Sequence, residues 1–410
     1  MSMGACRFCG APLQHVCADL GMSPIANAFL APDQLDRMEP FYPLRALVCD
    51  RCFLVQLEEF ETPEQIFSDY AYFSSYSSSW LEHSRRYAEM AIERFGLGPE
   101  ATVVELASND GYLLQYFHEA GIPVIGVEPA EDVAQAAILK GIPTVVRFFG
   151  VETARDLAET SRADLLIGNN VLAHVPDLND FVAGMKVLLA DDGVITMEFP
   201  HLMHLIAESQ FDTIYHEHFS YFSFLTAQRV FAEHGITLFD VEELPTHGGS
   251  LRIYGRHAQD ESRPVGDRVR ELAERERAAG YEDLAIYEGF AGSVRATKRD
   301  VLRFFLDAKG EGAAVAGYGA PAKGNTLLNY CGVGPEFLDY TVDMSPRKQG
   351  HFLPGTHIPI RAPEAIFETR PEYVFILPWN LKDEIVEQMA GIREWGGRFV
   401  VRAPAVTVIE

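Results

Sequence analysis

The 410-residue sequence lacks any apolar run long enough to cross a bilayer. Its first ten residues, MSMGACRFCG, also lack the basic-then-apolar layout of a secretory signal. We therefore predict a cytoplasmic protein with no membrane partner.

Positive charge is scarce as well. Lys and Arg number 34 against 59 Asp and Glu, for a formal net charge of -25. Because a phosphate backbone is held mainly by Lys and Arg, this balance disfavours general binding along DNA or RNA. A small phosphorylated ligand is still possible, since a few basic side chains or helix N-termini suffice to hold it.

Cysteine is sparse, yet four of the six cysteines form two pairs, Cys6-x-x-Cys9 and Cys49-x-x-Cys52. In a cytoplasmic chain this spacing favours a metal over disulfides. Four thiolates leave no coordination position for water, so we predict a structural Zn²⁺. Reduced core cysteines, or a redox-active pair, are the alternatives.

Short apolar strands alternate with helical stretches between residues 101 and 200, which predicts a parallel, doubly wound sheet. A charged, helical connector over 262–308 precedes a second set of short strands. We predict an α/β protein with three parts: a small zinc-binding domain (1–65), a central doubly wound domain (66–245) and a C-terminal Rossmann-like domain (246–410).

The first strand-to-helix turn of the central domain, ELASNDG, lacks the GxGxxG fingerprint whose glycines make room for a pyrophosphate. S-adenosylmethionine (SAM) carries no phosphate, so a looser turn suits it. We therefore predict that 66–245 is a SAM methyltransferase domain. Glu128 ends the next strand, where a carboxylate can accept from both ribose hydroxyls; a surface turn residue is the alternative. The predicted cofactor-binding residues are Glu105, Ala107, Asn109, Gly111, Glu128, Pro129, Asn169 and Asn170.

The string Tyr215-His216-Glu217-His218 places several titratable groups near the ligand edge of the predicted sheet. Burial can tune one of them into a general base. Metal binding, or hydrogen bonding of buried histidines, is the alternative, although the HExxH spacing is absent. On a strand, the two histidines would share a face. His174 is a second candidate base, with a capping or core role as its alternative.

Two further turns stay open on the residues alone. The loop THGGSLR, residues 246–252, combines glycines with Ser and Arg, and it either faces an anionic substrate or turns a strand. Lys323 and Asn325 follow the turn Gly317-Tyr318-Gly319-Ala320, where backbone N–H groups and one cation could receive a diphosphate. A structural turn with a surface lysine is the alternative.

The order of the motifs is more informative than any single motif. CxxC...CxxC, YAYFSSYSSSW, VVELASNDGYLL, GNNVLAHVPD, EFPHL, FDTIYHEHFSYFS, HGGSLR and AGYGAPAKGNTLLNY together resemble the nucleotide-deoxysugar C-methyltransferases over nearly the whole chain. In that family a zinc-binding domain precedes a methyltransferase domain, and a C-terminal Rossmann-like domain helps to hold the nucleotide sugar.

The resemblance implies methylation of a sugar carbon beside a ketone, at C3 of a dTDP-linked 4-keto-deoxysugar, by a monomer or weak homodimer in deoxysugar and antibiotic biosynthesis. Because carbon is a poor nucleophile, a base must first remove a C–H proton and the enolate must be stabilised. The resemblance implies His218 as this base, with support from Glu217 and Tyr215. It also places residues near the sugar and its nucleotide: Tyr72, Ser75, His174, Lys323 and Asn325.

Three other functions compete with this one. Methyl transfer to a sugar oxygen or nitrogen would need only a milder base. A nicotinamide-dependent oxidoreductase could use the GYGAPAKG turn, although that turn lacks a third glycine and has Pro321 where the helix should begin. A non-catalytic scaffold could use the zinc knuckle for docking.

Overall fold

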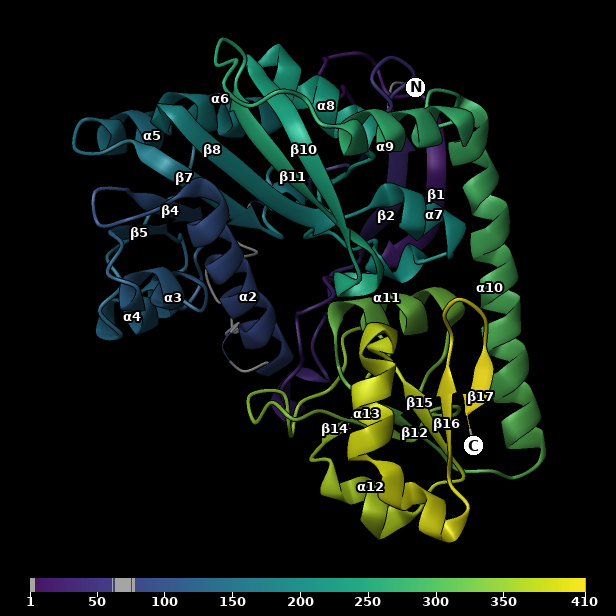
Figure 1. The fold of residues 1–410 in the computed structure, drawn as a ribbon. Coiled ribbons are helices and arrows are strands. Elements are labelled where there is room, and N and C mark those ends of the chain that lie inside the picture. Colours follow the sequence, from purple (N-terminus) through teal and green to yellow (C-terminus); the bar gives the residue numbers. More distant parts are fainter. Residues whose placement is uncertain (1–3, 61, 63–74, 76–77, 410) are drawn as a thin grey trace.

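The computed structural model describes residues 4–60, 62, 75 and 78–409, which form three β-sheets (Figure 1). The sheets have four, seven and six strands, in the N-terminal, central and C-terminal parts. The predicted α/β architecture with an N-terminal zinc-binding domain is confirmed. Among the described residues, no helix combines the length and apolarity that a membrane span requires.

The N-terminal sheet is antiparallel throughout, in the order β1-β2-β3-β9. Its strands are β1 (His15–Ser23), β2 (Tyr42–Val48), β3 (Val55–Leu57) and β9 (Ser220–Tyr221). Strand β9 comes from the central part of the chain, directly after the Tyr-His-Glu-His string. The N-terminal domain is therefore hydrogen-bonded to the segment that carries the predicted base.

The central sheet has the order β10-β11-β8-β7-β4-β5-β6. Strands β8 to β6 run parallel, as predicted, while β10 and β11 add an antiparallel hairpin that the sequence pattern did not reveal. The strands are β4 (Val103–Leu106), β5 (Val124–Val127), β6 (Thr144–Val145), β7 (Ala163–Asn169), β8 (Leu189–Pro200), β10 (Ile236–Leu244) and β11 (Ser250–His257).

Helices cover both faces of this sheet, and β7 explains why its sequence is apolar without alternation. Leu165 packs into a cluster with α2 and α3, whereas Leu166 packs into a cluster with α5 and α6. The helices of this part are α2 (Ser78–Phe95), α3 (Leu114–Glu119), α4 (Glu131–Leu139), α5 (Val151–Ala158), α6 (Leu178–Leu188), α7 (Leu202–Ala207) and α8 (Phe224–Glu233).

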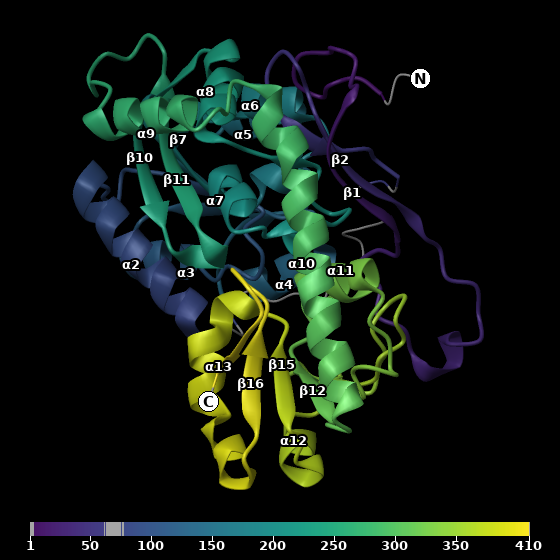
Figure 2. The ribbon, with the colours of Figure 1, turned by 90° about the vertical axis from the view of Figure 1, so that its right-hand side faces the viewer.

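The connector is helical, as predicted, and consists of α9 (Asp267–Ala278) and the long α10 (Leu284–Gly310). Figure 2 shows α10 running from the central domain down to the C-terminal domain, and it packs against β1 on the way. One helix thus contacts the N-terminal sheet and leads into the C-terminal one.

The C-terminal sheet has the order β14-β13-β12-β15-β16-β17, parallel except for β17. This arrangement matches the predicted Rossmann-like unit. Its elements are β12 (Val315–Tyr318), α11 (Ala322–Cys331), β13 (Tyr340–Val342), β14 (Ile360–Arg361), α12 (Glu364–Thr369), β15 (Tyr373–Ile376), α13 (Lys382–Gln388), β16 (Arg398–Val401) and β17 (Thr407–Ile409).

Candidate active site

Both Rossmann-like sheets reverse their strand order beside their first strand. In the central sheet β4 lies between β5 and β7, and in the C-terminal sheet β12 lies between β13 and β15. Ligands of such sheets bind outside the carboxyl ends of the strands at this point. One cavity of about 550 Å³ is lined by Ala107, just after β4, and by Lys323, just after β12. The two sheets therefore present their ligand edges to one shared site.

The turn after β4 is built from left-handed backbone. Ala107, Asn109 and Gly111 have φ values of 55°, 50° and 75°, a region that favours glycine. Ala107 and Asn109 adopt this strained conformation although both carry side chains. The turn brings Ala107 and Asn109 to the cavity wall.

Glu128 is a buried carboxylate at the end of β5, not a surface turn residue. It lines the cavity and accepts hydrogen bonds from the backbone N–H groups of Asn109, at 3.0 Å, and Ala130, at 2.9 Å. Burial raises the pKa of Glu128, whereas the two backbone hydrogen bonds lower it by a smaller amount. Because each carboxylate oxygen has a second lone pair, Glu128 can hold the turn and still accept from a ribose.

Two predicted cofactor residues lie behind the cavity wall. Glu105 is fully buried in β4, and neither of its oxygens meets a hydrogen-bond partner among the described residues. Desolvation raises the pKa of Glu105 well above the ordinary range, although the nearby Tyr112 hydroxyl acts to lower it. Gly111 also does not line the cavity. It faces Ile142 instead, since a Cβ on Gly111 would lie 3.1 Å from Ile142 Cγ1. Pro129, Asn169 and Asn170 do line it.

The imidazole rings of His218 and His174 lie next to each other in the cavity wall. Their ring centroids are 4.6 Å apart, and both rings are directed by backbone carbonyls: Nδ1 of His218 lies 3.1 Å from Thr213 O, and Nδ1 of His174 lies 2.7 Å from Glu217 O. A carbonyl only accepts, so each Nδ1 carries the proton and each neutral ring keeps a lone pair on Nε2.

Burial lowers the pKa of both imidazoles, to about 4 for His174 and well below the ordinary value for His218. Repulsion from His174, His247 and Lys323 in their charged forms lowers the pKa of His218 further. Both rings are therefore neutral near pH 7. A neutral ring can take up a proton, which is the state a general base requires.

The other members of the string separate. The Tyr215 ring packs against the His218 ring at a tilt of 36°, with centroids 4.1 Å apart. The Glu217 carboxylate does not contact the His218 ring; both its oxygens accept from the Asn27 amide, at 2.9 and 2.8 Å. His216 lies in a turn, and its Nε2 lies 3.2 Å from Pro43 O in the N-terminal domain. The segment is thus not a strand with both histidines on one face.

The C-terminal domain contributes two lysines to the cavity. Lys323 donates to Asn380 Oδ1 at 2.7 Å and lies over the Trp379 ring, and burial lowers its pKa to about 8. Lys348 donates to Ala320 O at 2.9 Å. Asn325 points away from the cavity and donates to Ala26 O at 2.6 Å. The predicted pair of Lys323 and Asn325 is therefore not brought together on one ligand.

Ser75 does not line the cavity. It donates to the carboxylate of Asp110, which lies in the turn after β4. Tyr72 lies outside the described residues. In the loop left open above, Arg252 is buried against Glu198, with Nη2 2.8 Å from Oε2, so it does not face a substrate. His247, from the same loop, does line the cavity.

The GYGAPAK turn is filled by its own domain. A Cβ on Gly319 would lie 2.5 Å from Pro378 Cδ, and one on Gly324 would lie 3.0 Å from Leu377 Cβ. These glycines permit close packing of β12 and α11 against the end of β15. They do not open a groove for a dinucleotide phosphate, which weakens the oxidoreductase alternative.

Several cavity residues were not among the predicted site residues. They are Asn27, Trp80, Tyr112, Arg147, His247 and Lys348. Asn27 and Lys348 lie in loops far from the predicted ligand edges, and only the tertiary fold brings them in. His247 had a signal, since it lies in the glycine-rich loop 246–252.

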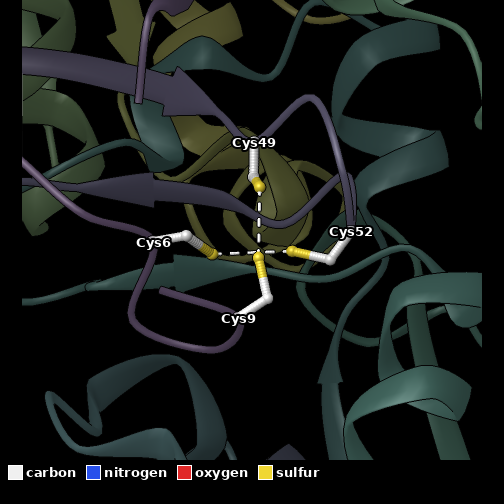
Figure 3. Close-up of side chains that lie close together, drawn as sticks. All are labelled: Cys6, Cys9, Cys49 and Cys52. Atoms are coloured by element: carbon white, nitrogen blue, oxygen red, sulfur yellow. Dashed lines mark hydrogen bonds between the residues drawn. The ribbon is translucent and has the colours of Figure 1, made fainter. Parts of the chain in front are cut away.

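The four predicted zinc ligands converge. Figure 3 shows Cys6, Cys9, Cys49 and Cys52 pointing at one another, with 3.5 Å between the Sγ atoms of Cys6 and Cys52 and between those of Cys9 and Cys49. Gln56 Nε2 lies 3.2 Å from the Cys6 sulfur. Four sulfur donors at this separation fit a closed tetrahedral Zn²⁺ site, which tethers the two knuckles and the start of the N-terminal sheet.

Three family models together match most of the chain. A zinc binding domain matches residues 6–67, a methyltransferase domain residues 80–241, and the C-methyltransferase C-terminal domain residues 245–404. The C-methyltransferase NovU of Streptomyces niveus is 36% identical over 407 residues, which cover 98% of this chain and 96% of NovU.

Solved methyltransferases resemble only about half of the chain. The 1,6-didemethyltoxoflavin-N1-methyltransferase of Burkholderia thailandensis is 18% identical with a TM-score of 0.38, covering 50% of this chain and 95% of its own. The magnesium protoporphyrin IX methyltransferase of Synechocystis PCC 6803 is 12% identical with a TM-score of 0.36, covering 48% and 99%. These low scores add nothing to what the full-length match establishes.

Proposed function

The chain belongs to the C-methyltransferase family and is a SAM-dependent C-methyltransferase, and from this premise we propose that its acceptor is a nucleotide-linked 4-keto-deoxysugar, methylated at C3. One observation carries the proposal. A single cavity joins the SAM turn, the neutral His174–His218 pair and two lysines of a second Rossmann-like domain.

The charges of the cavity support an anionic acceptor. The lysines Lys323 and Lys348 lie on the side of the C-terminal domain, whereas Glu128 lies on the side of the central domain. SAM is cationic at its sulfonium and presents ribose hydroxyls, which suit the carboxylate. A diphosphate is anionic and suits the lysines. The two ligands would thus enter from opposite sheets, with the histidines between them.

The histidines then supply the proton chemistry. We assign His218 as the base: Nε2 takes the proton from the sugar carbon beside the ketone, and the electron pair moves into an enolate. Tyr215 packs on this ring, and Thr213 O fixes its tautomer. A bound diphosphate beside Lys323 would offset one of the charges that lower the pKa of His218, so substrate binding would strengthen the base.

When bound, SAM supplies an electrophilic methyl group on sulfur. The carbanion carbon bonds to this methyl while the carbon–sulfur bond breaks, so the protein contributes alignment more than further chemistry. The enolate oxygen requires a hydrogen-bond donor, and the hydroxyl of Tyr215, which lines the cavity, can take this role. The four-cysteine zinc takes no part in these steps.

A direct test incubates the enzyme with SAM and a panel of nucleotide 4-keto-6-deoxysugars, followed by NMR of the products. We expect a new methyl signal on C3. Methylation of an oxygen or nitrogen, methylation of another carbon, or no reaction with any sugar despite SAM binding would each overturn the proposed acceptor or its position.

A further inference from the structure

A second cluster of metal-binding side chains lies outside the cavity. It consists of His201, the residue before α7, His204 within α7, and Glu243 near the end of β10. The candidate ligand atoms of these residues all lie within 4.8 Å of one another. None of these residues lines the cavity or belongs to the four-cysteine site.

His201 is the anchor of this cluster because its imidazole is fully buried and half-satisfied. Its Nε2 lies 2.6 Å from Glu276 Oε1. The Glu276 carboxylate also accepts from the backbone N–H groups of Phe224, at 2.7 Å, and Leu225, at 2.8 Å, so it acts as an acceptor. Nε2 of His201 therefore carries the proton of this hydrogen bond, and in this tautomer Nδ1 presents a lone pair.

That lone pair has no donor among the described residues, although Nδ1 is buried. Leaving a buried polar atom unpaired is unfavourable, so the position calls for a partner. A carboxylate on one nitrogen of an imidazole and a metal ion on the other is the arrangement that metal-binding histidines usually adopt. The Glu276–His201 pair already has the protein half of this arrangement.

His204 and Glu243 can complete the site by small side-chain rotations. Both are partly exposed, and Nε2 of His204 lies 4.0 Å from Glu243 Oε1. Metal–ligand distances of about 2.0–2.1 Å require these atoms to approach somewhat. Gly249 leaves the room that His204 occupies, since a Cβ there would lie 2.6 Å from His204 Cγ. Arg275, which lies 2.6 Å from Glu243, would have to swing into solvent.

We propose that His201 Nδ1, the His204 imidazole and the Glu243 carboxylate bind a second divalent metal ion of the zinc type, with solvent in the remaining position. Two imidazoles and one carboxylate suit Zn²⁺ and its neighbours in the first transition row. The ion would join α7 to β10. The ion would also stabilise the loop that carries His247, because the backbone N–H of His201 donates to Gly249 O at 3.0 Å.

The test is the metal content of the full chain after equilibration with Zn²⁺ and removal of excess metal. We expect two equivalents for the wild type and one for His204→Gln or Glu243→Gln. His118→Gln, which alters an exposed histidine outside the cluster, should keep two. Loading with Co²⁺ separates the sites, since only the cysteine site gives intense sulfur-to-metal charge-transfer bands.

His204→Gln should therefore lose the weak bands of the nitrogen–oxygen site and keep the charge-transfer bands. One equivalent in the wild type, or a second equivalent that persists in both His204→Gln and Glu243→Gln, would overturn the proposal. Both readouts are independent of methyl transfer, so failure of the proposed acceptor would not affect them.

Discussion

A buried ion pair between Arg402 and Asp212 connects the C-terminal domain to the segment that carries His218. Both side chains are fully buried. Arg402 donates to both carboxylate oxygens of Asp212 and to Ser209 O, and Trp379 Nε1 donates to Asp212 at 2.8 Å. Asp212 lies immediately before Thr213, whose carbonyl orients His218.

Arg402→Met should destabilise the protein by about 3–5 kcal/mol, because the substitution leaves the Asp212 carboxylate buried with only the neutral Trp379 donor. Asp212→Asn in the same chain should recover part of this loss, since no charge then remains uncompensated while Trp379 keeps an acceptor. Turnover should fall with Arg402→Met as the Thr213 carbonyl loses its support.

Urea unfolding followed by tryptophan fluorescence measures these free energies. Arg37→Met is a suitable control, because Arg37 and Asp33 form an exposed pair, which typically contributes about 0–1 kcal/mol. If Arg402→Met behaved like Arg37→Met, or if the double variant were no more stable than Arg402→Met alone, the reasoning would be refuted.

Two other predictions concern the cavity. Glu128→Ala should weaken binding of S-adenosylhomocysteine about 10–100-fold, measured by calorimetry, because a hydrogen bond to a charged group contributes about 1.5–3 kcal/mol. Glu131→Gln, at the exposed start of α4, is the control and should leave this affinity unchanged. Equal affinities in the two variants would show that the ribose binds elsewhere. Burial raises the pKa of Glu217 to about 7, and the Asn27 amide opposes the rise. The ionised Glu217 carboxylate attracts Lys348 in the cavity, where we propose that the diphosphate binds, so kcat/KM should increase with pH through about 7. Asn27→Ala removes the amide contact that stabilises the ionised form, so this limb should move to higher pH; an unmoved limb would show that Glu217 does not govern it.

Much of the fold follows from the sequence because its signals are local. The strand VVEL, the apolar run ADLLIG and the CxxC pairs each predict their own structure, and the order of strands and helices predicts two doubly wound sheets. The β10–β11 hairpin was not predicted, because it pairs antiparallel with β8, a strand that the sequence pattern assigns to the parallel part of the sheet. Strand β9 was not predicted either, because it has only two residues and pairs with the distant strand β3, which produces no periodic pattern in the sequence.

The site was predictable where a residue lies at the end of a strand or in a motif that resembles the family. Ala107, Glu128 and Asn169 reach the cavity for that reason. Asn27 and Lys348 arrive through contacts between domains, which no local pattern encodes. Similarly, spacing alone could not separate His216 from His218, since a turn sends one to the N-terminal domain and the other to the cavity.

The central claim is that His218 removes a proton from the carbon beside a sugar ketone, and hydrogen exchange tests it without methyl transfer. The wild type is incubated in D₂O with a nucleotide 4-keto-6-deoxysugar and S-adenosylhomocysteine, and deuterium at that carbon is followed by NMR. We predict exchange by the wild type and by His216→Gln, and none by His218→Gln despite normal binding of both ligands. Exchange by His218→Gln at the wild-type rate would contradict the account.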